Sequence, residues 1–138
     1  MSQPETPCRS HCPINFALEA FGDRWTLLII RDLMFKGKSR YSDFLSSDEQ
    51  MSTNILADRL KRLERLDMVT RTDEPGRRSR TSYALTDKGR DLLPIMLEIT
   101  RWSAAHDPTT NAPRAFVRAL DRDREAVEDA IRRSWDEE

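Results

Sequence analysis

The strongest constraint on the fold of this chain is a run of apolar residues at helical spacing that begins just after Ser52. When residues are placed at steps of about 100°, one arc of the expected helix collects aliphatic side chains, namely Ile55, Leu56, Leu60, Leu63 and Leu66. The opposite arc carries small and polar residues followed by basic ones: Thr53, Asn54, Ala57, Asp58, Lys61, Arg62 and Arg65. Ser52 is a favourable N-cap. We therefore predict an amphipathic helix with one buried face and one small-then-basic outer face.

A β-hairpin is expected directly after this helix. Residues 68–72 and 81–85 are rich in β-branched and aromatic residues and alternate in part between apolar and polar positions. Residues 73–80 between them combine a Pro-Gly turn with a basic cluster made of Arg77, Arg78 and Arg80. The hairpin should therefore carry positive charge at its tip.

Three shorter helices are expected before the amphipathic one. Pro13 suits the first position of a helix that Gly22 ends. Asp23 can cap a second helix, which is apolar on almost every side and is therefore expected at the centre of the core; Gly37 ends it. Ser39 can cap a short third helix.

Two longer helices are expected after the hairpin. Thr86 should cap a helix that continues through Trp102 and that Pro94 bends or delays. After a polar break, one last helix is expected from about residue 113 to residue 135. These helices carry many large apolar residues, although the elements before them already suffice to form the core of a single domain. We therefore expect a second copy of the chain to cover these residues. The residues concerned are Leu92, Leu93, Met96, Ile99, Trp102, Phe116, Val117, Leu120, Val127, Ile131 and Trp135.

The order of these elements is that of a winged helix-turn-helix. The predicted fold class is mainly α with a small β-hairpin wing, and with additional N- and C-terminal helices for dimerisation. We divide the chain into a flexible arm over residues 1–11, a winged-helix domain with flanking dimerisation helices over residues 12–103, and a linker with a C-terminal helix over residues 104–138. A length of 138 residues allows one compact domain and little more.

The charge distribution favours the middle of the chain as the part that meets a polyanion. The net charge is only −1, but residues 36–90 hold 13 basic and 9 acidic residues, whereas residues 104–138 hold 6 basic and 9 acidic residues. No stretch approaches the ~20 apolar residues of a membrane helix, and the N-terminus lacks the pattern of a signal peptide. We expect a cytoplasmic protein with no membrane partner. Glycine-rich phosphate loops, nucleophile elbows and catalytic histidine–carboxylate pairs are missing from the sequence, so no enzymatic activity is predicted.

The expected partner is double-stranded DNA. The major groove admits one helix, whose outer face near its N-terminus must carry short polar groups that reach base edges. The residues expected there are Ser52, Thr53, Asn54, Asp58 and Lys61. Contacts to the DNA backbone or from the wing are expected from Arg40, Arg59, Arg62, Arg77, Arg78 and Arg80. Arg59 has two interpretations, because it lies at the edge of the apolar arc: an ion-paired arginine that holds the helix in place, or a phosphate contact.

The N-terminal segment contains a second candidate site. Cys8, His11 and Cys12 offer three soft metal ligands, but a zinc site needs a fourth and the only other histidine is His106, so neither metal nor cofactor is predicted. Cys12 precedes the helix that Pro13 opens, where the positive end of the helix dipole favours a thiolate. A reactive redox sensor at Cys12, with Cys8 as a second candidate, and an unreactive thiol both remain open.

Several motifs together resemble the HxlR family of bacterial transcriptional regulators. They are Cys12-Pro13, the helix segment 25–33, the turn 41–44, the segment 56–64, the segment 81–89 and the late Trp102, and the resemblance spans residues 12–103. It implies a MarR-like winged-helix regulator that binds DNA as a homodimer, with an interface built from the N-terminal segment and the helices after the wing. Some relatives sense electrophiles or oxidants through an N-terminal cysteine, which here matches Cys12.

The expected function is therefore a transcriptional regulator, a repressor rather than an activator, that binds an inverted-repeat operator as a homodimer. It would respond to electrophiles or oxidants through Cys12, or to a small-molecule effector without a thiol switch. The alternative is a winged-helix domain used for protein–protein contact without DNA.

Overall fold

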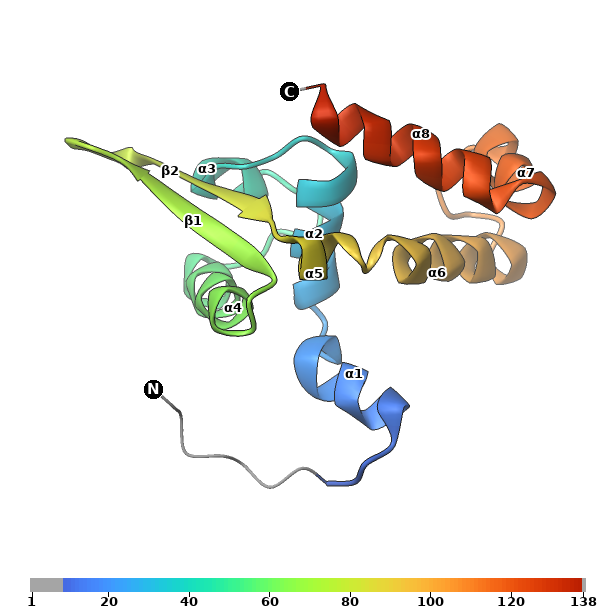
Figure 1. The fold of residues 1–138 in the computed structure, drawn as a ribbon, viewed down its shortest axis with the longest axis horizontal. Coiled ribbons are helices and arrows are strands. Elements are labelled where there is room, and N and C mark those ends of the chain that lie inside the picture. The colour runs from blue at the N-terminus through green and yellow to red at the C-terminus, as the bar shows by residue number, and fades with distance from the viewer. Residues whose placement is uncertain (1–8, 138) are drawn as a thin grey trace.

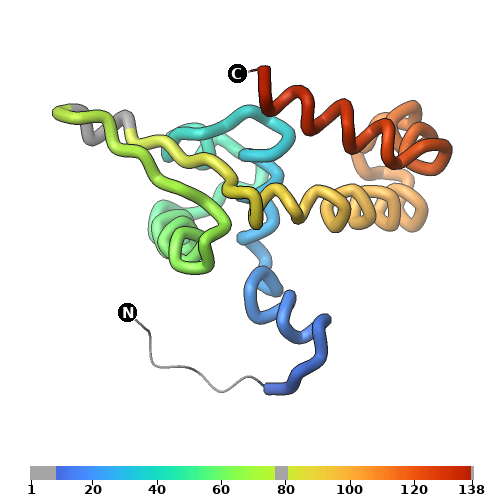
Figure 2. Tube along the Cα trace, in the orientation of Figure 1, coloured from blue at the N-terminus to red at the C-terminus, as the bar shows by residue number. Residues whose placement is uncertain are grey.

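The computed structural model describes residues 9–137, apart from the side chains of residues 77–80 (Figures 1 and 2). The chain is mainly helical, with a two-stranded antiparallel hairpin that projects at one end, which confirms the predicted winged-helix class. The elements follow in the order α1 (Pro13–Phe21), α2 (Thr26–Phe35), α3 (Tyr41–Leu45), α4 (Thr53–Arg65), β1 (Val69–Glu74), β2 (Arg77–Leu85), α5 (Asp87–Arg90), α6 (Leu93–His106), α7 (Arg114–Arg122) and α8 (Arg124–Asp136). Over residues 9–137, no helix combines the length and the apolar character needed to cross a membrane.

The core forms around α2, which lies between the wing end of the molecule and the C-terminal helices (Figure 1). Ile29 and Ile30 of α2 are fully buried, as the apolar run in this segment predicts. Side chains from four other helices and from the start of β1 also lie in this core, among them Phe44, Leu56, Leu60, Leu63, Val69, Leu93, Leu97 and Leu120. The three leucines of α4 in this set belong to the arc that was predicted to face inward.

Most of the predicted ends of the first four helices are present, with shifts of one or two residues at the starts of α2 and α3. Gly22 follows α1, and Gly37 follows α2 with a positive φ of 64°, which glycine adopts without strain. The Ser52 side chain accepts a hydrogen bond from the Ile55 N–H at 3.2 Å and so caps α4. The N-cap of α3 is Arg40, not Ser39 as predicted, because the Asp43 carboxylate accepts the Arg40 N–H at 3.2 Å and the helix therefore begins one residue later.

The wing is longer than the sequence pattern indicated. Glu74 pairs with Arg77, so only Pro75 and Gly76 form the connection, and Gly76 has a φ of 76°. Proline followed by a glycine with positive φ satisfies a type II turn, which is why the strands continue into the segment that was predicted as loop. Arg77, Arg78 and Arg80 consequently belong to β2 rather than to the turn.

The predicted helix from Thr86 to Trp102 is in fact two helices. The Thr86 hydroxyl accepts the Gly89 N–H at 3.1 Å and caps α5, which ends at Arg90. A new helix, α6, begins at Leu93 with Pro94 in its first turn and continues past Trp102 to His106. Proline lacks the N–H that a helix interior needs, so its tolerated place is the first turn of a new helix.

The C-terminal segment also forms two helices where one was predicted. Asp123 leaves helical geometry (φ −156°, ψ 80°), and its carboxylate accepts the Ala126 N–H at 3.1 Å to begin α8. The pair α7 and α8 folds back on the chain above α6 (Figure 1). The Trp135 indole Nε1 donates a hydrogen bond to the Met34 carbonyl at 2.9 Å, and the Arg90 guanidinium lies 5.2 Å from the centre of the Trp135 ring.

This packing corrects the expectation that the tail needs a second chain to cover it. Leu120 is buried, and Phe116, Val127, Ile131 and Trp135 are partly buried against the core of the same chain. The large apolar residues that stay open to solvent lie instead on α1 and α6, apart from Phe35 at the end of α2. They include Ile14, Phe16 and Leu18 of α1 and Ile95, Ile99 and Trp102 of α6.

Candidate nucleic-acid interface

The helix α4 and the wing lie together at one end of the molecule (Figure 1). The residues predicted to read bases, namely Ser52, Thr53, Asn54, Asp58 and Lys61, are all exposed. The opposite side of α4 is inaccessible, because Leu56, Leu60 and Leu63 lie in the core. The structure thus brings the predicted reading residues onto one solvent-facing surface of a helix whose other face is fixed by packing.

An ion pair between Asp23 and Arg59 fixes α4 against the start of α2. The Arg59 Nε lies 2.8 Å from Asp23 Oδ2, and both side chains are mostly buried. The same carboxylate accepts the N–H groups of Trp25 and Thr26 at 3.0 and 3.2 Å, so it also binds the start of α2, although the N-cap residue of α2 is Trp25 and not Asp23 as predicted. Of the two interpretations of Arg59, the ion-paired one describes this geometry; the phosphate contact stays a prediction.

The environment of Asp23 lowers its pKa well below the ordinary value. Burial of the carboxylate acts in the opposite direction, but hydrogen bonds from the Thr26 hydroxyl, from Arg59 and from the two backbone N–H groups together outweigh it. Arg59 also pairs with the neighbouring Asp58. Asp23 is therefore ionised throughout the physiological pH range.

A second group of charged side chains fixes the turn between α3 and α4. Asp32, which is buried on α2, accepts a hydrogen bond from the Ser47 hydroxyl at 2.6 Å and lies 3.0 Å from the Arg31 guanidinium. Arg31 in turn donates two hydrogen bonds to Glu49, at 2.7 and 2.9 Å, and these hydrogen bonds lower the pKa of Glu49 to about 2. This network was not predicted, because the apolar character of the segment dominates its pattern; the adjacent charges of Arg31 and Asp32 within that run are the signal that could have indicated it.

Besides Arg59, two residues that were predicted to contact the DNA backbone have described positions. Arg40 is exposed at the start of α3, where its backbone forms an isolated bridge with Ser82 of β2. Arg62 donates a hydrogen bond to the Glu19 carbonyl and so connects α4 to α1. The side chains of Arg77, Arg78 and Arg80 lie outside the described residues.

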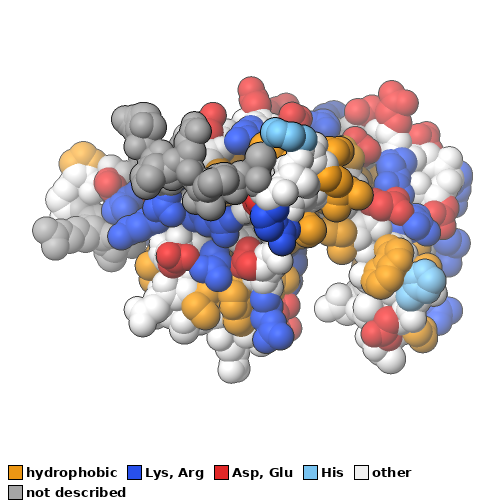
Figure 3. Space-filling view, turned by 90° about the horizontal axis from the view of Figure 1, so that it is seen from below, with side chains coloured by type: hydrophobic (Ala, Val, Ile, Leu, Met, Phe, Trp, Pro, Cys, Tyr) orange, Lys and Arg blue, Asp and Glu red, His pale blue; other side chains and the backbone are white. Residues whose placement is uncertain are grey.

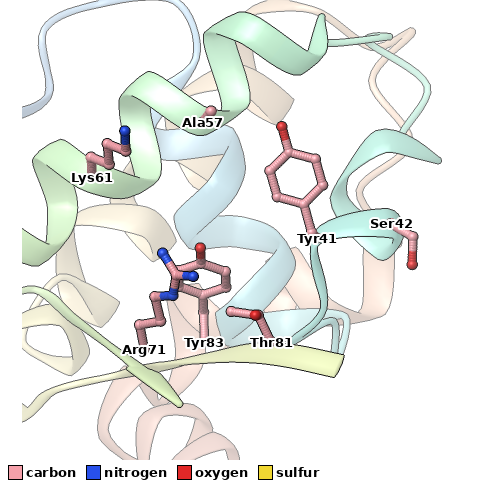
Figure 4. Close-up of a pocket in the computed structure, with 7 residues that line it drawn as sticks. All are labelled: Tyr41, Ser42, Ala57, Lys61, Arg71, Thr81 and Tyr83. Atoms are coloured by element: carbon pink, nitrogen blue, oxygen red, sulfur yellow. The ribbon is translucent and has the colours of Figure 1, made fainter. Parts of the chain in front are cut away.

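A cleft opens between α3, α4 and the wing, and its walls include residues that were not predicted as site residues. Tyr41, Arg71 and Tyr83 line it together with Lys61 (Figure 4). The Tyr41 hydroxyl donates a hydrogen bond to the Thr53 carbonyl at 2.7 Å, which attaches α3 to the first turn of α4. Aromatic and basic residues at these positions carry no periodic signal that marks them as neighbours, since they come from four different elements.

The N-terminal thiol occupies the position that the sequence predicts for it. Cys12 is exposed and is the N-cap residue of α1. Cys8 lies outside the described residues. In the part of the chain that the structure covers, no group of three or more histidine, cysteine, aspartate or glutamate side chains is arranged to hold a metal ion.

An exposed polar helix face, a helix-turn-helix pair and an adjacent wing define a winged-helix protein of the DNA-binding class. The family model of the HxlR-like helix-turn-helix matches residues 20–111 of this chain. The chain therefore belongs to the HxlR family, as its motifs predicted.

Individual relatives support the same class. YvaP of Bacillus subtilis, an uncharacterized HTH-type transcriptional regulator, is 37% identical over 93 residues, which are 67% of this chain and 85% of YvaP. The reduced form of the transcriptional regulator YodB from B. subtilis is 32% identical with a TM-score of 0.59, over 73% of this chain and 100% of YodB. The redox regulator HypR in its reduced form is 28% identical with a TM-score of 0.62, over 68% of this chain and 92% of HypR. These relatives are transcriptional regulators, not enzymes.

We expect Asp23→Asn to lower the free energy of unfolding by about 1–3 kcal/mol at neutral pH, because Arg59 loses its charged partner. The pKa of Asp23 is lowered in the folded chain from its ordinary value of 3.8, so its contribution is present above about pH 4 and is lost as the pH falls through the folded-state pKa. Denaturant unfolding at neutral pH and at about pH 3 should show that the difference between the two proteins narrows with acid. Asp129→Asn, at an exposed position of α8, is the control. Equal stabilities at neutral pH would contradict the assignment.

Proposed function

We propose that this chain is a sequence-specific DNA-binding repressor that recognises an inverted-repeat operator as a homodimer. The observation that carries the proposal is the exposed polar first turn of α4, Ser52 to Asn54, next to a basic wing in a member of the HxlR family. Such a regulator acts on DNA in the cytoplasm.

The polar face of α4 has the chemistry for reading bases. Asn54 can make two hydrogen bonds to an adenine edge, and Lys61 can reach a guanine or a phosphate. Ser52, Thr53 and Asp58 supply further short acceptors and donors on the same exposed side. Phosphate contacts are assigned to Arg40, Arg59, Arg62, Arg77, Arg78 and Arg80, and these position the helix without reading sequence.

Asn54→Ala and Arg78→Ala should weaken DNA binding in different ways. Loss of the base contact at Asn54 should cost ~1–3 kcal/mol on the operator and little on random DNA. Loss of the phosphate contact at Arg78 should weaken binding to both and reduce the salt slope by about one. Titrations of operator and random duplexes at several salt concentrations measure both effects. Unchanged operator preference in Asn54→Ala would show that another face of the chain reads DNA.

The same titration distinguishes the proposal from a protein–protein module. Phosphate contacts release counterions, so binding to DNA must weaken steeply with added salt. A winged-helix domain that contacts only proteins would show no salt-dependent retention on duplex DNA. That result would replace the proposed function.

Dimerisation is proposed through the apolar residues that the fold leaves uncovered. On α1, Ile14 and Phe16 are 70% and 72% exposed, and on α6 Trp102 is 58% exposed. Figure 3 views the molecule from the side of α1 and shows hydrophobic side chains open to solvent on this face. Apolar residues in this number usually mark an interface. Two copies would set their α4 helices about one DNA turn apart, ~34 Å.

Phe16→Asp should convert the dimer into a monomer, because a carboxylate would then be buried in an apolar interface. Sedimentation velocity at micromolar concentration should show the mass of two chains for the unmodified protein and of one chain for the variant. Ala130→Asp, at an exposed position of α8, should leave the mass unchanged. A monomeric unmodified protein would contradict the proposed dimer.

The effector is proposed to act on Cys12. Solved structures of the related YodB include quinone-bound and diamide-treated forms, and those of HypR include reduced and oxidized forms. In this chain Cys12 is exposed and lies directly before the apolar residues of α1. An adduct or a disulfide at this point would alter the packing of α1 in the proposed interface and hence the spacing of the two α4 helices. A small-molecule effector with no thiol chemistry is the alternative.

Diamide or a quinone should lower the operator affinity of the unmodified protein but not of Cys12→Ser. The matched variant Cys8→Ser should keep its response to the quinone, which needs only one thiol to add to the ring; its response to diamide tells whether Cys8 is the disulfide partner. Fluorescence anisotropy with labelled operator gives the affinities, and mass spectrometry verifies that Cys12 is modified. Unchanged affinity after verified modification of Cys12 would falsify the thiol switch.

A further inference from the structure

The cleft between α3, α4 and the wing has the size of a small-molecule site. Its volume is about 480 Å³, which is within the range of ligand pockets and far above the ~30 Å³ of a water molecule. Figure 4 shows Tyr41 from α3, Ala57 and Lys61 from α4, and Arg71 and Tyr83 from the two wing strands around the same space.

The apolar part of the cleft suits a planar ring. Two phenol rings and the Ala57 methyl group line it. The Tyr83 ring is held edge-on against Phe44, with ring centres 6.3 Å apart and an interplanar angle of 67°. The hydrogen bond between the Tyr41 hydroxyl and the Thr53 carbonyl fixes the other ring. Both aromatic walls are therefore preorganised, which lowers the entropy cost of binding a flat ligand.

The polar part of the cleft suits an anion. Lys61 and Arg71 line it, and among the described residues no aspartate or glutamate does. Asp73 pairs with the Arg71 Nε at 3.0 Å from outside this lining, so this ion pair does not use the terminal nitrogens of the guanidinium, which Figure 4 shows beside the Tyr83 ring. Arg71 and Tyr83 are cross-strand partners, so guanidinium and phenol lie side by side. Burial raises the pKa of Tyr83, so the phenol stays protonated and can donate a hydrogen bond.

We propose that this cleft binds a small aromatic carboxylate, with its ring between Tyr41 and Tyr83 and its carboxylate on Arg71 and Lys61. A planar carboxylate matches the two parallel donors of a guanidinium, and the ring fills the space that a simple anion would leave empty. Because Lys61 also belongs to the proposed DNA-reading surface, the ligand should compete with the operator. That second consequence rests on the proposed function; the binding site itself does not.

Calorimetric titration of benzoate into the DNA-free protein tests the site directly. Benzoate should bind at least about tenfold more tightly than benzamide, which lacks the charge, and than acetate, which lacks the ring. Arg71→Gln should weaken benzoate about tenfold or more, and Ala57→Leu, which fills the cleft on a helix that tolerates leucine, should abolish binding. Arg65→Gln, an exposed arginine of α4 outside the cleft, is the control and should bind as the unmodified protein does.

The possible results separate the ligand classes. If acetate or inorganic phosphate binds as tightly as benzoate, the cleft is a simple anion site, such as one for a DNA phosphate, and the proposal is overturned. Absence of saturable benzoate binding, or equal binding in Ala57→Leu, overturns it as well. A separate anisotropy titration should show benzoate, but not benzamide, releasing labelled DNA; if benzoate binds without releasing DNA, the competition is overturned while the site stands.

Discussion

The carboxylate of Asp23 connects the central helix α2 to α4, the helix that exposes the polar face. It accepts the N–H groups of Trp25 and Thr26 at the start of α2 and a hydrogen bond from the guanidinium of Arg59 on α4. A mostly buried carboxylate is costly unless its charge is compensated, and here a cation and several hydrogen bonds compensate it. The central helix and the exposed helix thus meet at one ionised group, so the direction in which α4 presents its polar face depends on that group.

The second charged cluster acts at the other end of α2. Asp32 accepts a hydrogen bond from the Ser47 hydroxyl, and Arg31 donates hydrogen bonds to Glu49. The turn that leads into α4 is therefore anchored to α2. Between these two polar anchors, the buried leucines of α4 supply the apolar contact with the core. Arg62 adds a contact from α4 to the Glu19 carbonyl of α1. Through it, the helix that begins at Cys12 touches the helix proposed to read DNA, which gives the proposed thiol switch a direct physical path.

Periodicity was sufficient to predict the elements whose faces differ most in polarity. The amphipathic pattern after Ser52 and the Pro-Gly turn of the wing depend on local residue order alone, and both are present in the fold. The tail was harder, because Asp123 looks like any exposed charge until its non-helical backbone separates α7 from α8. The apolar positions of the tail correctly predicted that these side chains are buried. They could not show whether a second chain or the same chain buries them. Tertiary packing decides that question, here through Leu120 and Trp135.

The packing of α7 and α8 limits the surface that is left for a second chain to bind. Because α7 and α8 cover part of α6 and the Met34 end of α2, the large apolar side chains left on α6 are those of Ile95, Ile99 and Trp102. These residues, together with the exposed face of α1, are distinct from the polar face of α4 and from the cleft beside it. One molecule therefore presents an apolar surface suited to another copy of itself and a basic, aromatic surface suited to anions. Asp23, in the segment between α1 and α2, pairs with Arg59 of α4, and Arg62 of α4 contacts the Glu19 carbonyl of α1. A change in the packing of α1 therefore has polar contacts through which it can reach α4.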